Sequence, residues 1–127
     1  MFSRIGKNDK LFSDLMLPIV LFFNRIANQS FVRTIGYLVE GRGVVIEYDG
    51  CYFSSDLEPD EEPFEGMLFS NGALKKEVLV DYSTALTYME AASKAFVREF
   101  PDKRQILDEL LRAFAKKHGV DYAGLLE

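Results

Sequence analysis

The sequence predicts an α+β fold, in which an antiparallel sheet of about four strands is flanked by N-terminal and C-terminal helices. Helical patterns occupy the first 40 residues and return after residue 81, whereas the middle of the chain carries β-branched and aromatic runs. Two hairpin-turn signals in that middle region require antiparallel pairing, and helices segregated from strands are typical of α+β folds. The length of 127 residues, without any linker, favours a single domain over 1–127.

Two helices are expected before the sheet, at 18–28 and 31–40. Pro18 suits a first helical turn, which needs no amide donor, and Ser30 is a favoured N-cap residue for the second helix. A further helical turn over 9–17 is an open alternative to a loop. The apolar run 15–23 follows three bases, as in a signal peptide, but Pro18 interrupts it and no small-residue cleavage site follows. We therefore interpret it as a buried helix.

Four strands are expected at 44–48, 51–55, 66–70 and 76–80. The first pair is joined by Asp49-Gly50, a strong signal for a two-residue turn, and the second pair by Asn71-Gly72. Two extra residues after Gly72 predict a longer loop or a bulge in the second hairpin.

Two helices are expected after the sheet, at 82–100 and 103–118. Asp81 is the predicted N-cap of the first, and Asp102 that of the second, with Gln105 as its capping-box partner. Gly119 ends the last helix, and the tail 120–127 either docks or frays. The apolar stripes predict burial of Leu86, Phe96, Leu110 and Phe114, with Ile106, Leu107 and Leu111 on the same buried face.

Acidic residues are concentrated in one segment. Between residues 43 and 74 there are eight acids and no Lys or Arg, whereas the rest of the chain carries 12 acids and 15 bases. The formal net charge of −5 therefore originates in this segment. A solvated loop is the simplest interpretation of such a run. Its position between two strands favours a preformed anionic surface for a basic protein partner.

Catalytic and metal-binding arrangements find little support. One Cys and one His cannot form a Cys/His zinc site, so Cys51 is interpreted as a buried thiol and His118 as a surface or capping residue. The carboxylates at 56, 58 and 60 alternate as in a calcium loop, but Glu61 and Met67 stand where that loop needs Gly and Glu. The segment 41–43 is interpreted as a helix end and not as a phosphate loop. We expect no enzyme activity, no cofactor and no metal.

Partners and compartment follow from the same composition. The acidic balance argues against nucleic acid, because phosphate binding needs clustered Lys and Arg. The nine-residue apolar run is too short to span a membrane. The single Cys51 rules out an intrachain disulfide framework and favours the reducing cytoplasm.

A family resemblance is carried by the run 61–70, Glu-Glu-Pro-Phe-Glu-Gly-Met-Leu-Phe-Ser, and continues through 77–82 and the helix containing Tyr88 and Phe96. Residues 18–43 also fit. Over about 16–111 the chain resembles the ribonuclease-toxin immunity proteins of contact-dependent growth inhibition (CDI) systems, the CdiI-like family. The resemblance implies a cytoplasmic, stoichiometric inhibitor that forms a 1:1 complex with a basic nuclease toxin domain. The chain departs from the family at 71–76 and from Ala113 onward.

The candidate toxin-binding residues combine these arguments. Carboxylates can imitate the RNA backbone and steer a basic cleft toward the protein, while apolar anchors slow dissociation. The candidate set is Asp49, Tyr52, Asp56, Glu58, Asp60, Glu61, Glu62, Phe64 and Glu65. Whether such a protein fills the toxin's active site or blocks an adjacent surface stays open. Two alternatives also stay open: an acidic antitoxin or adaptor-type module with a non-nuclease target, and a small enzyme or metal protein that uses the carboxylates.

Overall fold

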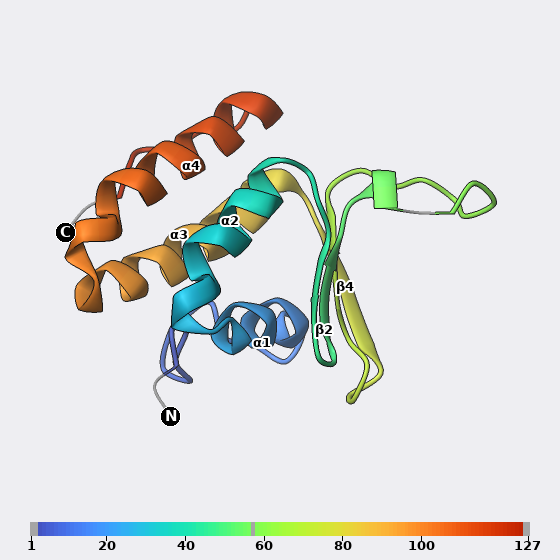
Figure 1. Ribbon diagram of the computed structural model, residues 1–127. Coiled ribbons are helices and arrows are strands. Elements are labelled where there is room, and N and C mark those ends of the chain that lie inside the picture. Colours follow the sequence, from blue (N-terminus) through green and yellow to red (C-terminus); the bar gives the residue numbers. More distant parts are fainter. Residues whose placement is uncertain (1–2, 57, 126–127) are drawn as a thin grey trace.

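Helices gather on one side of a four-stranded antiparallel sheet in the computed structural model shown in Figure 1, which describes residues 3–56 and 58–125. The strands lie in the order β1-β2-β3-β4. Their bounds are Val44–Ile46 (β1), Asp49–Tyr52 (β2), Met67–Asn71 (β3) and Lys76–Val80 (β4). The helices are α1 (Leu17–Arg25), α2 (Phe31–Val39), α3 (Tyr82–Glu99) and α4 (Arg104–His118), with 3-10 turns at Asn28–Ser30, Ser54–Asp56 and Pro101–Lys103. The predicted fold class is confirmed.

The first hairpin turns two residues earlier than its sequence predicts. Ile46 pairs with Asp49, so the turn lies at Glu47 and Tyr48, with Glu47 at a φ of 55°, and Asp49-Gly50 belongs to β2. The predicted turn is wrong because the Asp49 carboxylate is held inside the protein. It accepts hydrogen bonds from Arg25 Nε at 2.9 Å and from Asn71 Nδ2 at 2.7 Å.

The other strands lie close to their predicted positions. β4 begins and ends as expected, and β3 is displaced by one residue. The second hairpin has the predicted longer loop, in which Asn71 Oδ1 accepts the Leu74 amide at 2.8 Å. β2 ends at Tyr52, three residues early, because the Asp56 carboxylate accepts the Phe53 amide at 2.7 Å and bends the chain into a 3-10 turn.

The N-termini of the helices agree only in part with the predicted caps. Asp81 caps α3, accepting the Thr84 amide at 2.8 Å, as predicted. Ser30 occupies the N-cap of α2, but its hydroxyl accepts from the Arg33 guanidinium and makes no cap bond. The capping box at Asp102 is wrong: the Pro101–Lys103 turn places Lys103 at the N-cap of α4, with no side-chain cap bond. The helical alternative for 9–17 is also wrong, since α1 begins only at Leu17.

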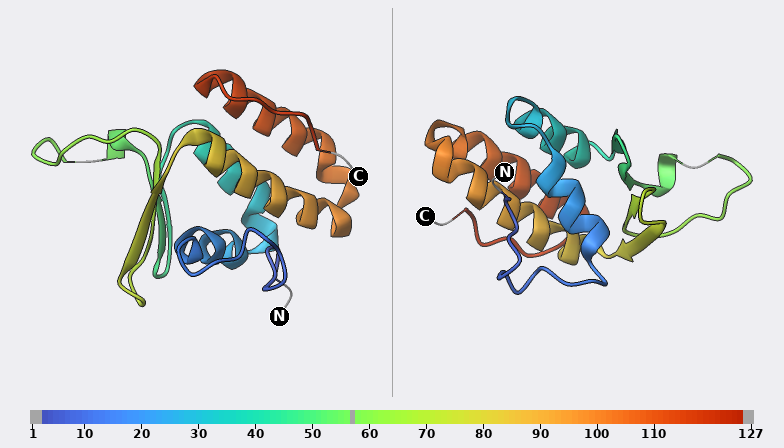
Figure 2. Two further views of the ribbon diagram at one scale, coloured as in Figure 1. Left: turned by 180° about the vertical axis from the view of Figure 1, so that it is seen from behind. Right: turned by 90° about the horizontal axis from the view of Figure 1, so that it is seen from below.

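The core lies between the helices and the inner face of the sheet, the face toward them. Phe22 and Phe23 of α1 meet Phe69 of β3 with ring centroids 5.5 and 5.8 Å apart. The buried side chains of α1 confirm that the apolar run 15–23 contains a buried helix. Figure 2 shows α1 beside the sheet. No helix among the described residues is both long and apolar enough to cross a membrane.

Three of the four predicted core residues are buried: Leu86, Phe96 and Phe114. Leu110 is only half-buried and Ile106 is 45 % exposed, so their predicted burial is wrong. The buried stripe of α4 instead runs through Leu107, Leu111, Phe114 and Ala115. α4 packs against α2 and α3 along this stripe, which turns its neighbouring apolar residues toward the rim of the contact.

Candidate functional site

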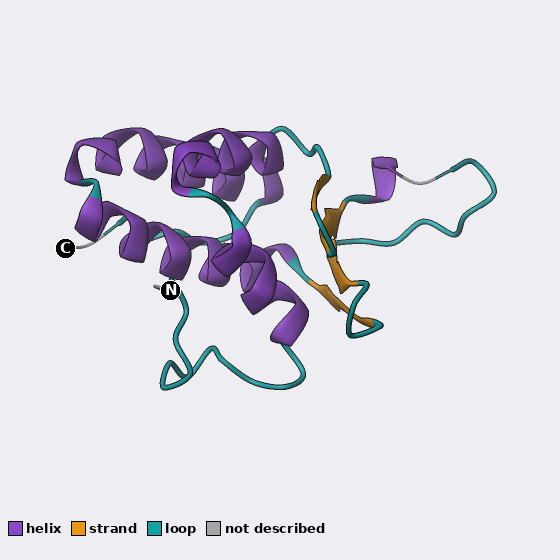
Figure 3. Cartoon of the chain, turned by 60° about the horizontal axis from the view of Figure 1, so that its bottom comes forward, coloured by secondary structure: helices purple, strands orange, loops and turns teal. Residues whose placement is uncertain are grey.

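The acidic loop, residues 54–66, leaves the sheet at the end of β2 and returns at the start of β3. In Figures 1 and 3 it extends away from the helices. Six of its carboxylates are exposed, those of Asp56, Glu58, Asp60, Glu61, Glu62 and Glu65. Among the described residues, no base forms an ion pair with any of them. The loop is therefore a concentrated negative surface whose charges are uncompensated within the part of the chain that the structure describes.

A few hydrogen bonds shape this loop. Asp56 is committed to the backbone, since its carboxylate also accepts the Gly43 amide at 3.4 Å. Across the base of the loop, the Phe64 amide donates to Ser54 Oγ at 3.2 Å. Nearer the tip, Glu61 Oε1 accepts the Glu58 amide at 3.1 Å. The base of the loop is thus fastened by the bonds of Asp56 and Ser54, while its other carboxylates lie on exposed residues.

Gly66 closes the loop where the chain enters β3. Its φ is +98°, in the region that glycine tolerates, and a side chain there would collide with the backbone carbonyl of Val80. The Glu-Pro-Phe-Glu-Gly run therefore has a structural reason for its glycine: β3 must start against the end of β4.

Asp49 does not belong to the exposed acidic surface. Its side chain is fully buried, and its two oxygens are taken by Arg25 and Asn71. It cannot touch a partner without breaking these bonds, so its place in the candidate set is corrected to a structural one. A buried charge is tolerated when it is paired and hydrogen-bonded, which is the case here.

The two aromatic candidates occupy different places. Tyr52 is half-buried on the outer face of the sheet, at the base of the acidic loop. Phe64 is also half-buried, and its backbone amide donates to Ser54 Oγ, so its side chain is only partly exposed to a partner. The loop acids and Tyr52 thus lie at one end of the sheet. The Asp49 side chain lies on the inner face, toward the helices.

The other chemistry-bearing side chains are packed into the fold. Cys51 is buried, which confirms its interpretation as a buried thiol, and burial followed by the charge of Asp56 raises its pKa well above the usual range. His118 is half-buried and stacks on Tyr82 with centroids 3.7 Å apart, so its interpretation as a surface or capping residue is wrong. No cluster of three or more metal-ligating side chains occurs among the described residues.

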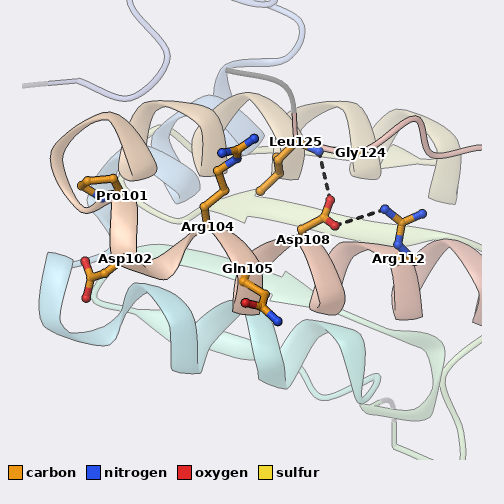
Figure 4. A pocket seen from close by; sticks show the side chains of 8 residues that line it. All are labelled: Pro101, Asp102, Arg104, Gln105, Asp108, Arg112, Gly124 and Leu125. Atoms are coloured by element: carbon orange, nitrogen blue, oxygen red, sulfur yellow. Dashed lines mark hydrogen bonds and ion pairs between the residues drawn. The ribbon is translucent and has the colours of Figure 1, made fainter.

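A pocket between α4 and the tail, shown in Figure 4, is built around Asp108. This carboxylate accepts from Tyr122 Oη at 2.7 Å, from the Leu125 amide at 3.0 Å and from Arg112 at 3.1 Å. The hydrogen bond from Tyr122, the largest cause, holds the pKa of Asp108 below its usual value. These bonds from Tyr122 and Leu125 to Asp108 hold the described part of the tail, residues 120–125, against α4. Sequence reasoning left this outcome open because no local pattern links residues 108 and 122.

A comparison with protein families covers most of the chain, including the acidic loop and the sheet. Residues 13–111 match the family described as CDI immunity protein. The chain belongs to this family. The match covers the sheet, the acidic loop and all four helices except the end of α4. No curated protein matches the chain.

Membership of the CDI immunity family gives the general function of the protein. It neutralises a cognate CDI toxin by binding it, and it is not an enzyme. The functional site is therefore a protein-binding surface, and the exposed part of the candidate set is its first candidate.

Proposed function

We propose that this CDI immunity protein neutralises a basic nuclease toxin, a ribonuclease, in a 1:1 complex whose main electrostatic contact is the acidic loop. The observation that carries the proposal is the row of six exposed carboxylates on residues 56–65, which have no ion-pair partner among the described residues. Nucleases hold phosphate with Lys and Arg, so their clefts are positive. A surface of opposite sign raises the association rate and selects such a partner.

The loop suits this role physically. Its carboxylates repel one another, so a cation from a partner relieves this repulsion and displaces no ion pair among the described residues. The loop stands clear of the helices, which lets it enter a concave surface (Figure 3). We place the encounter in the cytoplasm, where the free thiol of Cys51 stays reduced.

The test is association kinetics with the cognate CDI toxin domain, at two salt concentrations. The loop variant carries Glu58→Gln, Asp60→Asn, Glu61→Gln and Glu62→Gln. The control removes four exposed acids on the helical side, by Glu40→Gln, Asp102→Asn, Glu109→Gln and Asp121→Asn. Both variants lose the same charge, so they separate a local effect from a general one.

We expect the loop variant to associate about tenfold or more slowly at low salt and to lose most of its salt dependence. Its melting temperature stays equal or rises, because like-charge repulsion is removed. The control should lose much less association rate. An association rate in the loop variant equal to that of the wild type would move the contact elsewhere. A toxin domain that does not degrade RNA would show that the partner is not a ribonuclease.

A further inference from the structure

The outer face of the sheet, the face away from the helices, carries an apolar row that no described element of the chain covers. Tyr52 pairs with Leu68, and Leu68 pairs with Leu79, so the three side chains lie side by side across β2, β3 and β4. Val45 of β1 shares this face. The helices pack only on the opposite face, as Figures 1 and 2 show. Leu79 is 51 % exposed and Val45 is 60 % exposed.

Gly50 gives this row a flat aromatic surface. A Cβ added at Gly50 would lie 2.6–2.8 Å from the far end of the Tyr52 ring, so the ring lies against the glycine. Glycine inside a strand weakens it and commonly marks a close approach. Here the close approach holds the Tyr52 ring down on the sheet. A ring held in this way loses little side-chain entropy when a partner covers it, which is how Tyr contributes to protein interfaces.

The charges around the row indicate the kind of partner. The row lies at the end of the sheet from which the acidic loop departs, since Tyr52 ends β2 and Leu68 is the second residue of β3. Glu77 is exposed on the same face, while Lys75 and Lys76 lie at the opposite end, beside the β3–β4 turn. The loop projects to the side that this face looks toward (Figure 1). A partner seated on the row therefore meets carboxylates at its edge.

We propose that this outer face is the apolar centre of the toxin interface and that the acidic loop is its charged rim. An apolar centre with a polar rim is the usual anatomy of a protein interface, and central aromatic and aliphatic residues carry most of its affinity. The partner is accordingly a basic protein that presents apolar side chains to the sheet and Lys or Arg to the loop. The inference rests on the proposed function, because it takes the basic nuclease toxin as the occupant.

The division of labour follows from this arrangement. The loop acts at long range and sets the association rate, whereas the row acts only on contact and sets the dissociation rate. Substitutions in the two regions should therefore be distinguishable in one kinetic experiment.

The experiment compares the wild type with Leu79→Arg and with Ile106→Arg in binding to a catalytically inactive form of the cognate toxin domain. Ile106 is a matched control, because it is 45 % exposed but lies on α4, on the helical side. Leu79→Arg places a positive charge on the row, against a basic partner. We expect Leu79→Arg to raise Kd at least tenfold, mainly through faster dissociation, and Ile106→Arg to stay within twofold of the wild type. Leu79→Thr, which suits an exposed strand, is the second variant should the arginine variant fail to fold.

Two results would overturn the inference. One is a Kd for Leu79→Arg within twofold of the wild type while the acidic-loop variant still associates slowly; the proposed function would then stand without this interface. The other is a free protein that sediments as a dimer and becomes monomeric with Leu79→Arg, which would make a second copy the occupant. Failure of the proposed function shows separately, as a loop variant that associates as fast as the wild type or as a toxin domain that does not degrade RNA.

Discussion

The two faces of the sheet are made from alternate residues of the same strands, but they meet opposite surroundings. On the inner face, Cys51 and Phe69 are fully buried against α1, and even a carboxylate, Asp49, is enclosed and paired. On the outer face, their sequence neighbours Tyr52 and Leu68 remain partly exposed. The comparison teaches that the buried core and the proposed binding surface are separated by a step of one residue along each strand, because side chains alternate across the sheet.

The largest expected effect tests the inner face. Phe69→Ala removes a ring that packs on Phe22 and Phe23, and we expect it to lower the free energy of unfolding by about 3–5 kcal/mol. Leu79→Ala on the outer face is the control and should change it by no more than about 0.5 kcal/mol. Urea unfolding of both variants measures the difference. Equal losses would mean that the outer face is also part of the core.

An intermediate effect tests the junction between the two faces and the acidic loop. Gly66→Ala forces a side chain against the Val80 carbonyl at a φ of +98°, and we expect a loss of about 1–3 kcal/mol. Gly72→Ala is the matched control, because a Cβ there meets its nearest atom at 3.8 Å and the residue is exposed. Thermal melts of the two variants decide. A harmless Gly66→Ala would show that β3 can start without this close approach.

The smallest effect concerns the helical side, where His118 stacks on Tyr82 and meets Phe114 in an edge-on contact. Burial first, and then the charge of Lys117, lowers the pKa of His118 below its usual 6.5. The unfolded chain therefore takes up the proton first as the pH falls. The corresponding stability is present above about pH 6.5 and is lost as the pH drops from there through the lower folded-state pKa.

This pH dependence can be isolated because His118 is the only histidine. The measurement is the free energy of unfolding at pH 7.5 and 5.5 for the wild type and for His118→Gln, whose difference cancels the titration of the carboxylates. We expect the wild type to lose more stability than the variant on acidification. An equal loss in both proteins would show that the stacked ring accepts a proton freely.

Local signals in the sequence were enough for most of the fold. Asp81 followed by a helical stripe located α3, and the β-branched run 76–80 located β4. The Asp49-Gly50 turn failed because residues 24 and 22 positions away, Arg25 and Asn71, bind the carboxylate. No local pattern contains such partners, and tertiary pairing prevailed over turn propensity.

The site divides in the same way. The acidic loop is visible in sequence because its charges are contiguous. The apolar row is not, because it joins residues 52, 68 and 79, and only the strand register places them together. The anchoring of the N-terminal segment is also absent from the sequence prediction, because it depends on contacts between distant residues. Arg4 donates to the carbonyls of Phe23 and Ile26, at 2.8 and 2.7 Å, and no local sequence motif indicates these bonds.

The most direct test of the separation between a stabilising inner side and a binding outer side is amide hydrogen exchange of the protein with and without its toxin. We expect new protection in the acidic loop and in β2 through β4, and no change in α4. Protection confined to α4 and the pocket around Asp108, with the loop and the sheet unchanged, would contradict the account and move toxin binding to the helical side.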